Sequence, residues 1–509
     1  MSSSPSYDVI IVGSGAGGGT LARHLAPSGK RILILERGDF LPQEPKNWDS
    51  HAVMRDCRYR CDTWLDRNGK PFDPHMYYFV GGNTKVFGCV LYRLRREDFG
   101  ELIHHGGISP AWPISYEDLE PYYGKAEAWY QVHGRHGMDP TDPPTSKHLP
   151  FKPVSHEPII QQLSDGLTAA GYHPAPLPLG IMLDEDRPGN SPCIRCKTCD
   201  GFPCFKHAKC DAEVLGVRPA IAYPNVTLLT NAEVIRLETS PTGREVTRVI
   251  ARLGDGEKSF QGNFIVLAAG AANTARLLLM SHNQRHPNGL ANGSGQVGRN
   301  YMCHNLTMMV KFLPRENSVV FQKTLALNDF YFGSDDFHFP MGNVQMVGKT
   351  SGDHYRNEVS KLVPDWLLDR ASQNSVDFFL MTEDLPNPKN RITLTDKGQI
   401  RLHYRPNNME GMRQLKRRWK NILGKISGFQ WGLCINHPIS ARGLGHQTGT
   451  CRFGLDPKDS VLNRDCRAHE LDNLYIVDAS IFPSSGAVNP ALTIMANALR
   501  VGDHILQRF

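Results

Sequence analysis

The sequence predicts an α/β protein in which a parallel sheet with helices is built from separated parts of the chain and an antiparallel-sheet domain is inserted between them. Three observations predict this. The segment 7–36 reads as a strand, a glycine-rich turn, a helix and a second strand. Residues 260–280 and 474–506 each add a further strand followed by a helix. Between these two segments, residues from about 300 to 435 are richer in β signals.

The first strand is the apolar run Val9–Val12, which suits a buried position in a parallel sheet. A GxGxxG pattern follows it, made by Gly13, Gly15 and Gly18, and Gly19–Leu25 then opens a helix. The glycines allow a tight turn, close approach of the backbone to a pyrophosphate, and close helix–strand packing, with the phosphate at the helix N-terminus.

The second strand is Arg31–Leu35, and Glu36 ends it. A carboxylate at this place can accept hydrogen bonds from ribose hydroxyls. Because strand, glycines, helix, second strand and acid occur in order, the sequence predicts binding of a dinucleotide.

Further elements follow from local patterns. Ser115 precedes Asp118 by three residues, which is typical of a capping box at a helix start. A helix is predicted over 157–170, where the apolar residues share one face. Strands are predicted as a meander over 225–229, 232–237 and 246–253, and as a parallel strand over 260–270 with a helix through 271–280.

The inserted domain is predicted from strands at Thr307–Leu313, Val344–Val347 and Val376–Thr382 and from a hairpin-like segment at 392–404. This pattern is compatible with an antiparallel sheet that carries a substrate cavity. The strand LYIVDAS at 474–480 and a helix over Pro490–Leu506 return the chain to the first domain.

The chain has 509 residues, of which 40% are apolar and 21% charged, as expected for a globular protein with two or three structural units. The net charge of +6 is small, and the basic run 413–420 reads as a solvated helix face, so a nucleic-acid-binding module is excluded. No apolar run reaches the roughly 18–20 residues of a membrane span, and the start lacks the features of a secretory signal. We therefore expect a cytoplasmic protein without a transmembrane segment.

Twelve cysteines are present, and five of them lie between Cys193 and Cys210. The spacing of Cys193, Cys196, Cys199 and Cys204 differs by one residue from a run that ligates iron–sulfur clusters. Four thiolates could also hold zinc, or two could form a disulfide, although a cytoplasmic setting disfavours the latter. Unligated structural cysteines are the remaining alternative. The sequence leaves these alternatives open.

Three C-terminal segments carry a family resemblance: GHQTGTCRFG at 445–454, LYIVDAS at 474–480 and VNPALT at 488–493. Together with the N-terminal glycines they resemble the glucose–methanol–choline (GMC) flavoprotein oxidoreductases. In that family a βαβ unit for the ADP half of FAD is followed by a GG loop near the flavin, an HxxGT segment, a D-x-S strand and an H-or-N-P helix start.

The resemblance covers most of the chain, since Gly81-Gly82, WPISYEDLEPYY, VLAAGA and VGRN also fall in the expected order. It is weakest between about 310 and 435. It implies that the dinucleotide is FAD. It also implies a Rossmann-like FAD-binding domain of the GMC/PHBH-like type with an inserted antiparallel-sheet substrate domain.

The expected domain organisation is discontinuous. The FAD-binding domain takes its first part from 1–110, its second from 206–300 and its third, with the catalytic residues, from 439–509. Residues 111–205 form mixed loops and helices with the cysteine-rich segment at 193–210, and the substrate-binding domain is 301–438.

Oxidation of an alcohol requires loss of the hydroxyl proton and transfer of a hydride to flavin N5, and a neutral imidazole suits the proton step. The resemblance makes His446 the active-site base. Asn489 matches a position where other members carry His or Asn; it cannot act as a base, so it would hydrogen-bond the substrate oxygen. Asn489 also precedes Pro490 at the start of the last helix, whose positive dipole end would face the flavin.

The resemblance also implies the cofactor contacts. Asp478 would meet the ribityl chain and Val234 the adenine through its main chain. The expected cofactor-binding residues are Gly13, Gly15, Ala16, Gly18, Glu36, Gly82, Asn83, Val234, Ala269, Asp478, Ala479, Asn489, Pro490 and Thr493. Some members bind the flavin covalently through a histidine in the GG loop; residues 81–86 contain none, so non-covalent FAD is expected.

We therefore predict FAD-dependent oxidation of a small-molecule alcohol to a carbonyl compound, with a sugar or other polyol as one candidate. Dioxygen, a quinone or a redox partner would take the electrons. Some related sugar dehydrogenases carry an iron–sulfur cluster in a comparable region, which would make this chain a dehydrogenase subunit feeding a partner. A flavin-dependent lyase or photodecarboxylase on the same fold, or a non-catalytic flavin-binding subunit, are the alternatives. Candidate residues of the substrate cavity, in no order, are His304, Asn328, Phe330, Tyr331, Asn343 and Gln345.

Overall fold

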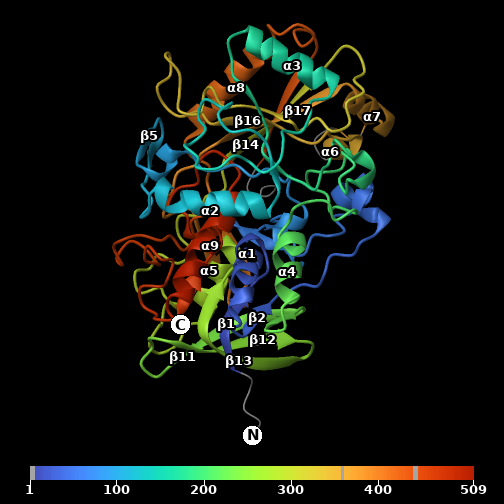
Figure 1. The fold of residues 1–509 in the computed structure, drawn as a ribbon. Helices are drawn as coiled ribbons and strands as arrows, with labels where there is room; N and C mark the ends of the chain where they lie inside the picture. The colour runs from blue at the N-terminus through green and yellow to red at the C-terminus, as the bar shows by residue number, and fades with distance from the viewer. Residues whose placement is uncertain (1–5, 357–359, 361, 440–444) are drawn as a thin grey trace.

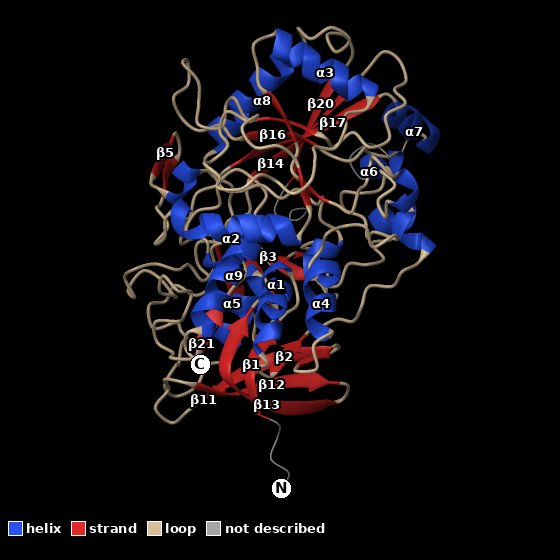
Figure 2. Ribbon diagram, in the orientation of Figure 1, coloured by secondary structure: helices blue, strands red, loops and turns tan. Residues whose placement is uncertain are grey.

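The computed structural model describes residues 6–356, 360, 362–439 and 445–509. In the view of Figure 1 the lower half holds a sheet with helices α1, α4, α5 and α9, and the upper half holds a second sheet with α3 and α8 above it. Figure 2 shows the two groups of strands separated by helices and long loops. This confirms the predicted α/β fold with an inserted antiparallel sheet.

The lower sheet has seven strands in the order β10-β2-β1-β13-β12-β11, with β21 paired to β13. Strand β1 pairs in parallel with both β2 and β13, as the N-terminal unit predicts. The strands are β1 Ser6–Val12, β2 Ile32–Leu35, β10 Val226–Leu229, β11 Ala232–Thr239, β12 Val246–Leu253, β13 Gly256–Leu267 and β21 Leu474–Ile476.

The predicted meander is wrong in one strand. β10 pairs in parallel with β2 and extends the parallel sheet, whereas β11, β12 and β13 form the antiparallel part. The long strand β13 belongs to both parts, because residues 256–260 pair with β12 and residues 261–267 pair in parallel with β1.

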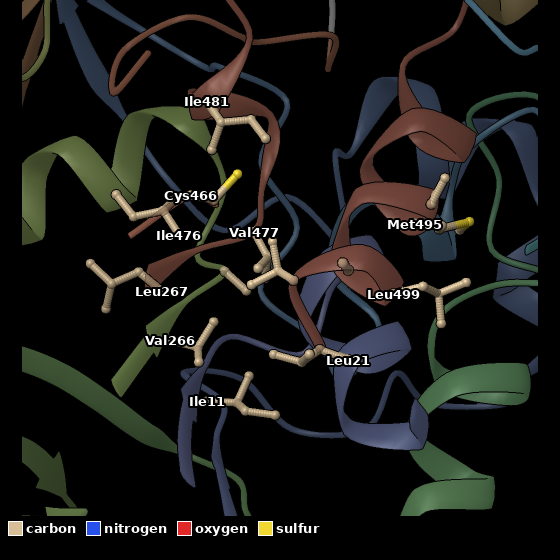
Figure 3. Packing of buried hydrophobic residues seen from close by; sticks show 14 of the residues in the cluster. Ile11, Leu21, Val266, Leu267, Cys466, Ile476, Val477, Ile481, Met495 and Leu499 are labelled. Atoms are coloured by element: carbon tan, nitrogen blue, oxygen red, sulfur yellow. The ribbon is translucent and has the colours of Figure 1, made fainter. Parts of the chain in front are cut away.

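A buried apolar cluster joins this sheet to its helices (Figure 3). Ile11, Val266 and Ile476 come from three neighbouring parallel strands and are fully buried. Leu21 of α1 and Leu499 of α9 pack in the same cluster. Each such aliphatic side chain contributes roughly 1.5–3 kcal/mol by leaving water, so the cluster holds the three separated segments together. The helices are α1 Ala16–Leu25, α4 Arg218–Ile221, α5 Ala271–Met280 and α9 Ala491–Leu506.

The upper sheet has six strands in the order β20-β14-β17-β16-β15-β8, and its pairs are antiparallel. One face packs against helices α3 and α8; Phe378 of β17 lies against Trp419 of α8, with ring centroids 5.1 Å apart. The elements are β8 Pro174–Pro176, β14 Asn305–Phe312, β15 Leu325–Leu327, β16 Asn343–Met346, β17 Ser375–Thr382, β20 Cys434–Ile439, α3 Pro158–Ala169 and α8 Met409–Leu423.

The predicted hairpin at 392–404 forms, but not in this sheet. Its strands β18 and β19 join β3 and β4 in a separate four-stranded sheet, because their apolar side chains pack with Trp64 and Phe72. The elements are β3 Trp64–Asp66, β4 Pro71–Phe72, β18 Arg391–Leu394 and β19 Ile400–His403.

The predicted helix starts are also present. Helix α2 (Tyr116–Trp129) begins after Ser115, whose Oγ accepts from the N–H of Asp118 at 3.2 Å in a capping box. The expected third part of the FAD-binding domain starts at the last residue of β20, and residues 440–444 after it lie outside the described residues. The remaining helices and strands are α6 Gly352–Arg356, α7 Asp365–Gln373, β5 Leu102–His104, β6 Gly107–Ser109, β7 Val132–His133 and β9 Leu179–Gly180.

Candidate active site

A cavity of about 510 Å³ lies between the carboxyl ends of the parallel strands and the antiparallel sheet. This is where α/β proteins place their ligands. The residues predicted for catalysis or cofactor binding that line it are Gly13, Gly15, Ala16, Glu36, Gly82, Asn83, Val234, Ala269, His446, Asp478, Ala479, Asn489 and Pro490.

The glycine loop has the shape that a pyrophosphate requires. A Cβ on Gly15 would face open space in the cavity, with Gly81 O as its nearest neighbour at 4.0 Å. Gly13 has a left-handed φ of 97°, and a Cβ there would lie 2.5 Å from Ala268 O. Helix α1 starts at Ala16 without a side-chain cap, so its first N–H groups remain available to an anion.

Two predicted cofactor contacts lie outside the residues that line the cavity. A Cβ on Gly18 would lie 2.0 Å from Gly13 O, so this glycine serves the close packing of helix on strand that the motif also predicts. Thr493 is fully buried, and its Oγ1 lies 2.7 Å from the Tyr123 hydroxyl. Thr493 thus packs between α9 and α2, and its contact with the cofactor stays a prediction.

Glu36 lines the cavity but is also held by the protein. Its Oε2 accepts from the N–H of Ser14 at 3.0 Å and from the Ser14 hydroxyl at 2.5 Å, and Oε1 accepts from the N–H of Gly38 at 3.0 Å. Burial raises the pKa of Glu36 in spite of these bonds. Sequence analysis missed Ser14, although it stands inside the GxGxxG motif; its Oγ also accepts from the N–H of Gly81, which ties the two glycine loops together.

Asp478 likewise combines a structural role with a place in the cavity wall. Its Oδ2 accepts from the N–H of Gly270 at 3.0 Å and from the Thr274 hydroxyl at 2.5 Å, at the N-terminus of α5. Its Oδ1 accepts from the N–H of Ser480 at 2.9 Å. These bonds fix the carboxylate that is predicted to meet the ribityl chain.

The two ends of the predicted FAD site are formed by irregular backbone. The β11–β12 ladder is interrupted by a bulge between Val234 and Arg236, beside the cavity where the adenine is predicted. In the GG loop, a Cβ on Gly82 would lie 3.3 Å from Gly15 Cα, so the two loops meet closely. Asn83 is fixed there, because its Oδ1 accepts from the N–H of Tyr77 at 3.1 Å.

His446 and Asn489 both line the cavity, and His446 is held by a second histidine. The Nδ1 atoms of His446 and His304 lie 3.2 Å apart, and Nε2 of His304 lies 3.1 Å from Ser485 O. A carbonyl only accepts, so His304 carries its proton on Nε2 and, when neutral, accepts at Nδ1. His446 must then donate from Nδ1, which leaves its Nε2 without a proton.

The surroundings of both histidines lower their pKa and so favour the neutral imidazole. Burial, with the neighbouring His304 as the second cause, lowers the pKa of His446 to about 3. Burial also lowers the pKa of His304, although Asp384 acts in the opposite direction. Asp384 fixes the loop that carries His304, since its carboxylate accepts from the N–H of Cys303 and of His304.

Asn489 offers a free oxygen at the same cavity. Its Oδ1 is buried and has no hydrogen-bond partner among the described residues. A buried amide oxygen without a partner is unfavourable, which favours a bound molecule that donates a hydrogen bond to it. The residue directly precedes Pro490, the N-cap of α9, as the sequence predicts.

The six candidate substrate residues separate into four groups. Gln345 lines the cavity, and His304 acts through His446. Asn343, Asn328 and Tyr331 belong to a buried hydrogen-bond network outside it, in which Asn343 Nδ2 donates to Asn328 Oδ1 at 2.7 Å and the Tyr331 hydroxyl donates to Asp98 at 2.9 Å. Phe330 packs against the cluster between the upper sheet and its helices.

The described residues give no support to the metal site that the cysteine spacing suggests. Among the described residues no three His, Cys, Asp or Glu side chains converge on one point that could hold a metal ion, and Cys193, Cys196, Cys199 and Cys204 are free thiols. Cys199 is instead buried beside Cys89, and Cys204 Sγ accepts from the N–H of Ala208 at 3.3 Å. The described residues therefore give no support to the iron–sulfur, zinc or disulfide interpretation.

Comparison with known proteins supports the family resemblance seen in the sequence. A family model described as GMC oxidoreductase matches residues 7–306, and a second model of the same description matches residues 386–498. The chain is 31% identical to 6'''-hydroxyparomomycin C oxidase of Streptomyces lividus, over 97% of this chain and 90% of that protein. It is 27% identical to 2-methyl-1,2-propanediol dehydrogenase of Mycolicibacterium austroafricanum, over 99% and 95%.

A solved structure shows the same fold. The crystal structure of pyridoxine 4-oxidase from Mesorbium loti superposes with a TM-score of 0.67 at 19% identity, over 98% of this chain and 99% of that chain. In the part of the chain that the structure describes, no helix is both long and apolar enough to cross a membrane.

Proposed function

Because the chain belongs to the GMC oxidoreductase family, we propose that it oxidises a primary or secondary alcohol to the carbonyl compound, with His446 as the base and Asn489 as the group that orients the hydroxyl. The observation that carries the proposal is the hydrogen-bond chain from Ser485 O through His304 to His446. It presents an unprotonated Nε2 in the wall of the cavity where the Asn489 oxygen lacks a partner.

The residues of the cavity fit FAD, which the family uses. Gly15 and the start of α1 would hold the pyrophosphate, Glu36 and Val234 the adenosine end, and Asp478 the ribityl chain. FAD supplies a hydride acceptor when it is bound. The loop 81–86 contains no histidine, so we propose that the cofactor is held without a covalent bond.

His446 and Asn489 have different roles in removing the hydroxyl proton. His446 Nε2 takes the hydroxyl proton, since Nδ1 is already engaged with His304. Asn489 donates from Nδ2 to the substrate oxygen, so the single hydroxyl proton is left to His446. The low pKa of His446 keeps the imidazole neutral before substrate binds. A positioned base of this kind contributes typically about 10²–10⁴-fold to rate.

The experiment follows the flavin spectrum of the holoenzyme under anaerobic conditions in the dark, with a panel of alcohols added. We expect bleaching by at least one alcohol in the wild type. In His446→Ala the bleaching should be lost although FAD stays bound, and it should persist in His173→Ala, which removes an exposed histidine. Full bleaching in His446→Ala would refute the role of the base.

The same experiment separates the alternative functions. A lyase or photodecarboxylase leaves the flavin oxidised through turnover in the dark, and a non-catalytic flavin-binding subunit shows no turnover. A dehydrogenase subunit that passes electrons through an iron–sulfur cluster is not favoured, because no group of three His, Cys, Asp or Glu side chains in the described residues could hold a metal ion. Reoxidation of the bleached enzyme by dioxygen, a quinone or a protein partner then identifies the electron acceptor.

A further inference from the structure

The wall that the antiparallel sheet gives to the cavity is apolar except for one amide. Met308 of β14, Phe379 of β17 and Gln345 of β16 are directly opposite one another across neighbouring strands, so they form one row on one face of the sheet. All three line the cavity. Leu306 and Val347, two residues along their strands, share this face and line the cavity too.

The opposite face of the sheet is already occupied. Met309, Phe378 and Val344 stand on the other side of the same strands and are packed in the cluster with α3 and α8. The register of the strands therefore fixes which side chains a substrate meets. On this face the only polar side chain of the row is a glutamine, and its neighbours are Met, Phe, Val and Leu.

Gln345 has the features of a residue that binds a ligand. It is only 2% exposed, and its Oε1 has no hydrogen-bond partner among the described residues. Asn343, two residues earlier on the same strand, donates from Nδ2 to Asn328 outside the cavity, and its own Oδ1 also has no partner among the described residues. A buried amide oxygen is satisfied only by a hydrogen-bond donor, such as a hydroxyl group of a bound molecule.

Charge also limits what can bind against this wall. Asp200 lines the cavity beside the residue that follows Val347, since its carboxylate accepts from the N–H of Gly348 at 2.6 Å. The same carboxylate is already paired with Lys323 Nζ at 2.7 Å. The row itself carries no ionisable side chain. An ammonium group on a substrate would lose its water here without gaining a partner of opposite charge.

We propose that the substrate is a neutral alcohol with an apolar, aromatic or alicyclic body and a second hydroxyl group, which donates a hydrogen bond to Gln345. Met308, Phe379, Leu306 and Val347 contact the apolar body. This inference rests on the proposed function, since it assumes that His446 and Asn489 meet the reacting hydroxyl. It disfavours sugars, whose many hydroxyls would face apolar side chains.

The test uses matched alcohols. 1,4-Benzenedimethanol carries the second hydroxyl, 4-methylbenzyl alcohol lacks it, and 4-(aminomethyl)benzyl alcohol replaces it with an ammonium group; glucose represents the sugars. Binding to the holoenzyme is measured by calorimetry with His446→Asn, which removes the proposed base, and kcat/KM is measured with the wild type. We expect the binding constant and kcat/KM to be about 3- to 10-fold higher for the diol than for the methyl analogue, which is the effect of one neutral hydrogen bond.

Substitution of Gln345 gives the decisive comparison. Gln345→Leu should abolish the preference for the diol and leave the methyl analogue nearly unchanged, and Gln345→Glu should improve binding of the amine. Asn343→Leu is the matched control, because its side chain lies outside the cavity, and should retain the preference. The proposal would be overturned if Gln345→Leu kept the preference for the diol, or if the wild type bound the diol and the methyl analogue equally. It would also be overturned if the wild type bound the amine or glucose more strongly, or did not bind the aromatic alcohols.

These outcomes are distinguishable from failure of the proposed function. Binding by calorimetry requires no turnover, so the role of Gln345 is read even if no alcohol bleaches the flavin. Conversely, bleaching that disappears in His446→Ala while glucose or the amine is preferred would support the proposed function and refute the substrate class.

Discussion

Acidification from pH 8 to pH 5 should leave the proposed base of this enzyme intact. Free imidazole side chains have a pKa near 6.5, whereas burial beside His304 lowers the pKa of His446 to about 3. The hydrogen bond from His446 Nδ1 to His304 Nδ1 leaves Nε2 of His446 as the atom that takes the substrate proton.

The magnitude follows from the two pKa values. At pH 5 a base with a pKa of about 3 is roughly 1% protonated, whereas one with a pKa of 6.5 is about 97% protonated. The unperturbed histidine would therefore lose about 30-fold of its active form between pH 8 and pH 5. His446 should lose almost none of it.

The assay is the pH dependence of kcat/KM for anaerobic flavin reduction by one neutral alcohol, whose own ionisation does not intervene. This parameter reports ionisations of the free enzyme. Thermal unfolding at each pH verifies that the fold persists over the range. We expect no acidic limb above pH 5, and a limb with an apparent pKa between 6 and 7 would refute the account of the histidine pair.

Three further predictions concern neighbouring parts of the molecule. His304→Asn, which tolerates the left-handed backbone at this position (φ 64°), should slow flavin reduction by about 2- to 10-fold with FAD still bound, and an unchanged rate in stopped-flow would contradict the positioning role. Gly18→Ala should destabilise the protein by about 1–3 kcal/mol, because its Cβ would lie 2.0 Å from Gly13 O, whereas Gly189→Ala has open space and should not; equal melting temperatures would count against the packing argument. Burial raises the pKa of Asp98 to about 7, so the folded state holds a proton that the unfolded state releases near pH 4, and stability is lost as pH rises through 7. The melting temperature of Asp98→Asn should therefore rise relative to that of the wild type between pH 5 and pH 8. A difference in melting temperature that stays constant over this range would refute the argument.

The fold could be predicted at both ends of the chain because its signals there are local. The apolar run Val9–Val12, the following glycines and the start of the last helix each lie within a few residues. Pairing between strands that lie far apart in the sequence could not be predicted. Nothing within 225–229 distinguishes a strand that pairs in parallel with β2 from one in a meander, and nothing near 392–404 indicates Trp64 as a packing partner.

In the site, too, residues in local motifs could be predicted and residues that act through distant contacts could not. His446 and Asn489 stand in short recognisable motifs, and the structure brings both to one cavity. The role of His304 depends on the direction in which a left-handed backbone and Asp384 turn its ring, which spacing alone does not reveal. The cysteine spacing alone could not decide between ligated and unligated thiols, because residues close in sequence need not form a geometry that holds a metal ion.

The most direct measurement of the central claim is chemical rescue of the base. Anaerobic flavin reduction by an alcohol is followed in the dark in His446→Ala, with and without added imidazole, at several pH values. If His446 Nε2 takes the hydroxyl proton, imidazole should restore a measurable rate that rises as its own ring loses a proton near pH 7. A variant that bleaches as fast as wild type without imidazole would contradict the claim, as would a variant that keeps its FAD and substrate binding but gains nothing from imidazole at any pH.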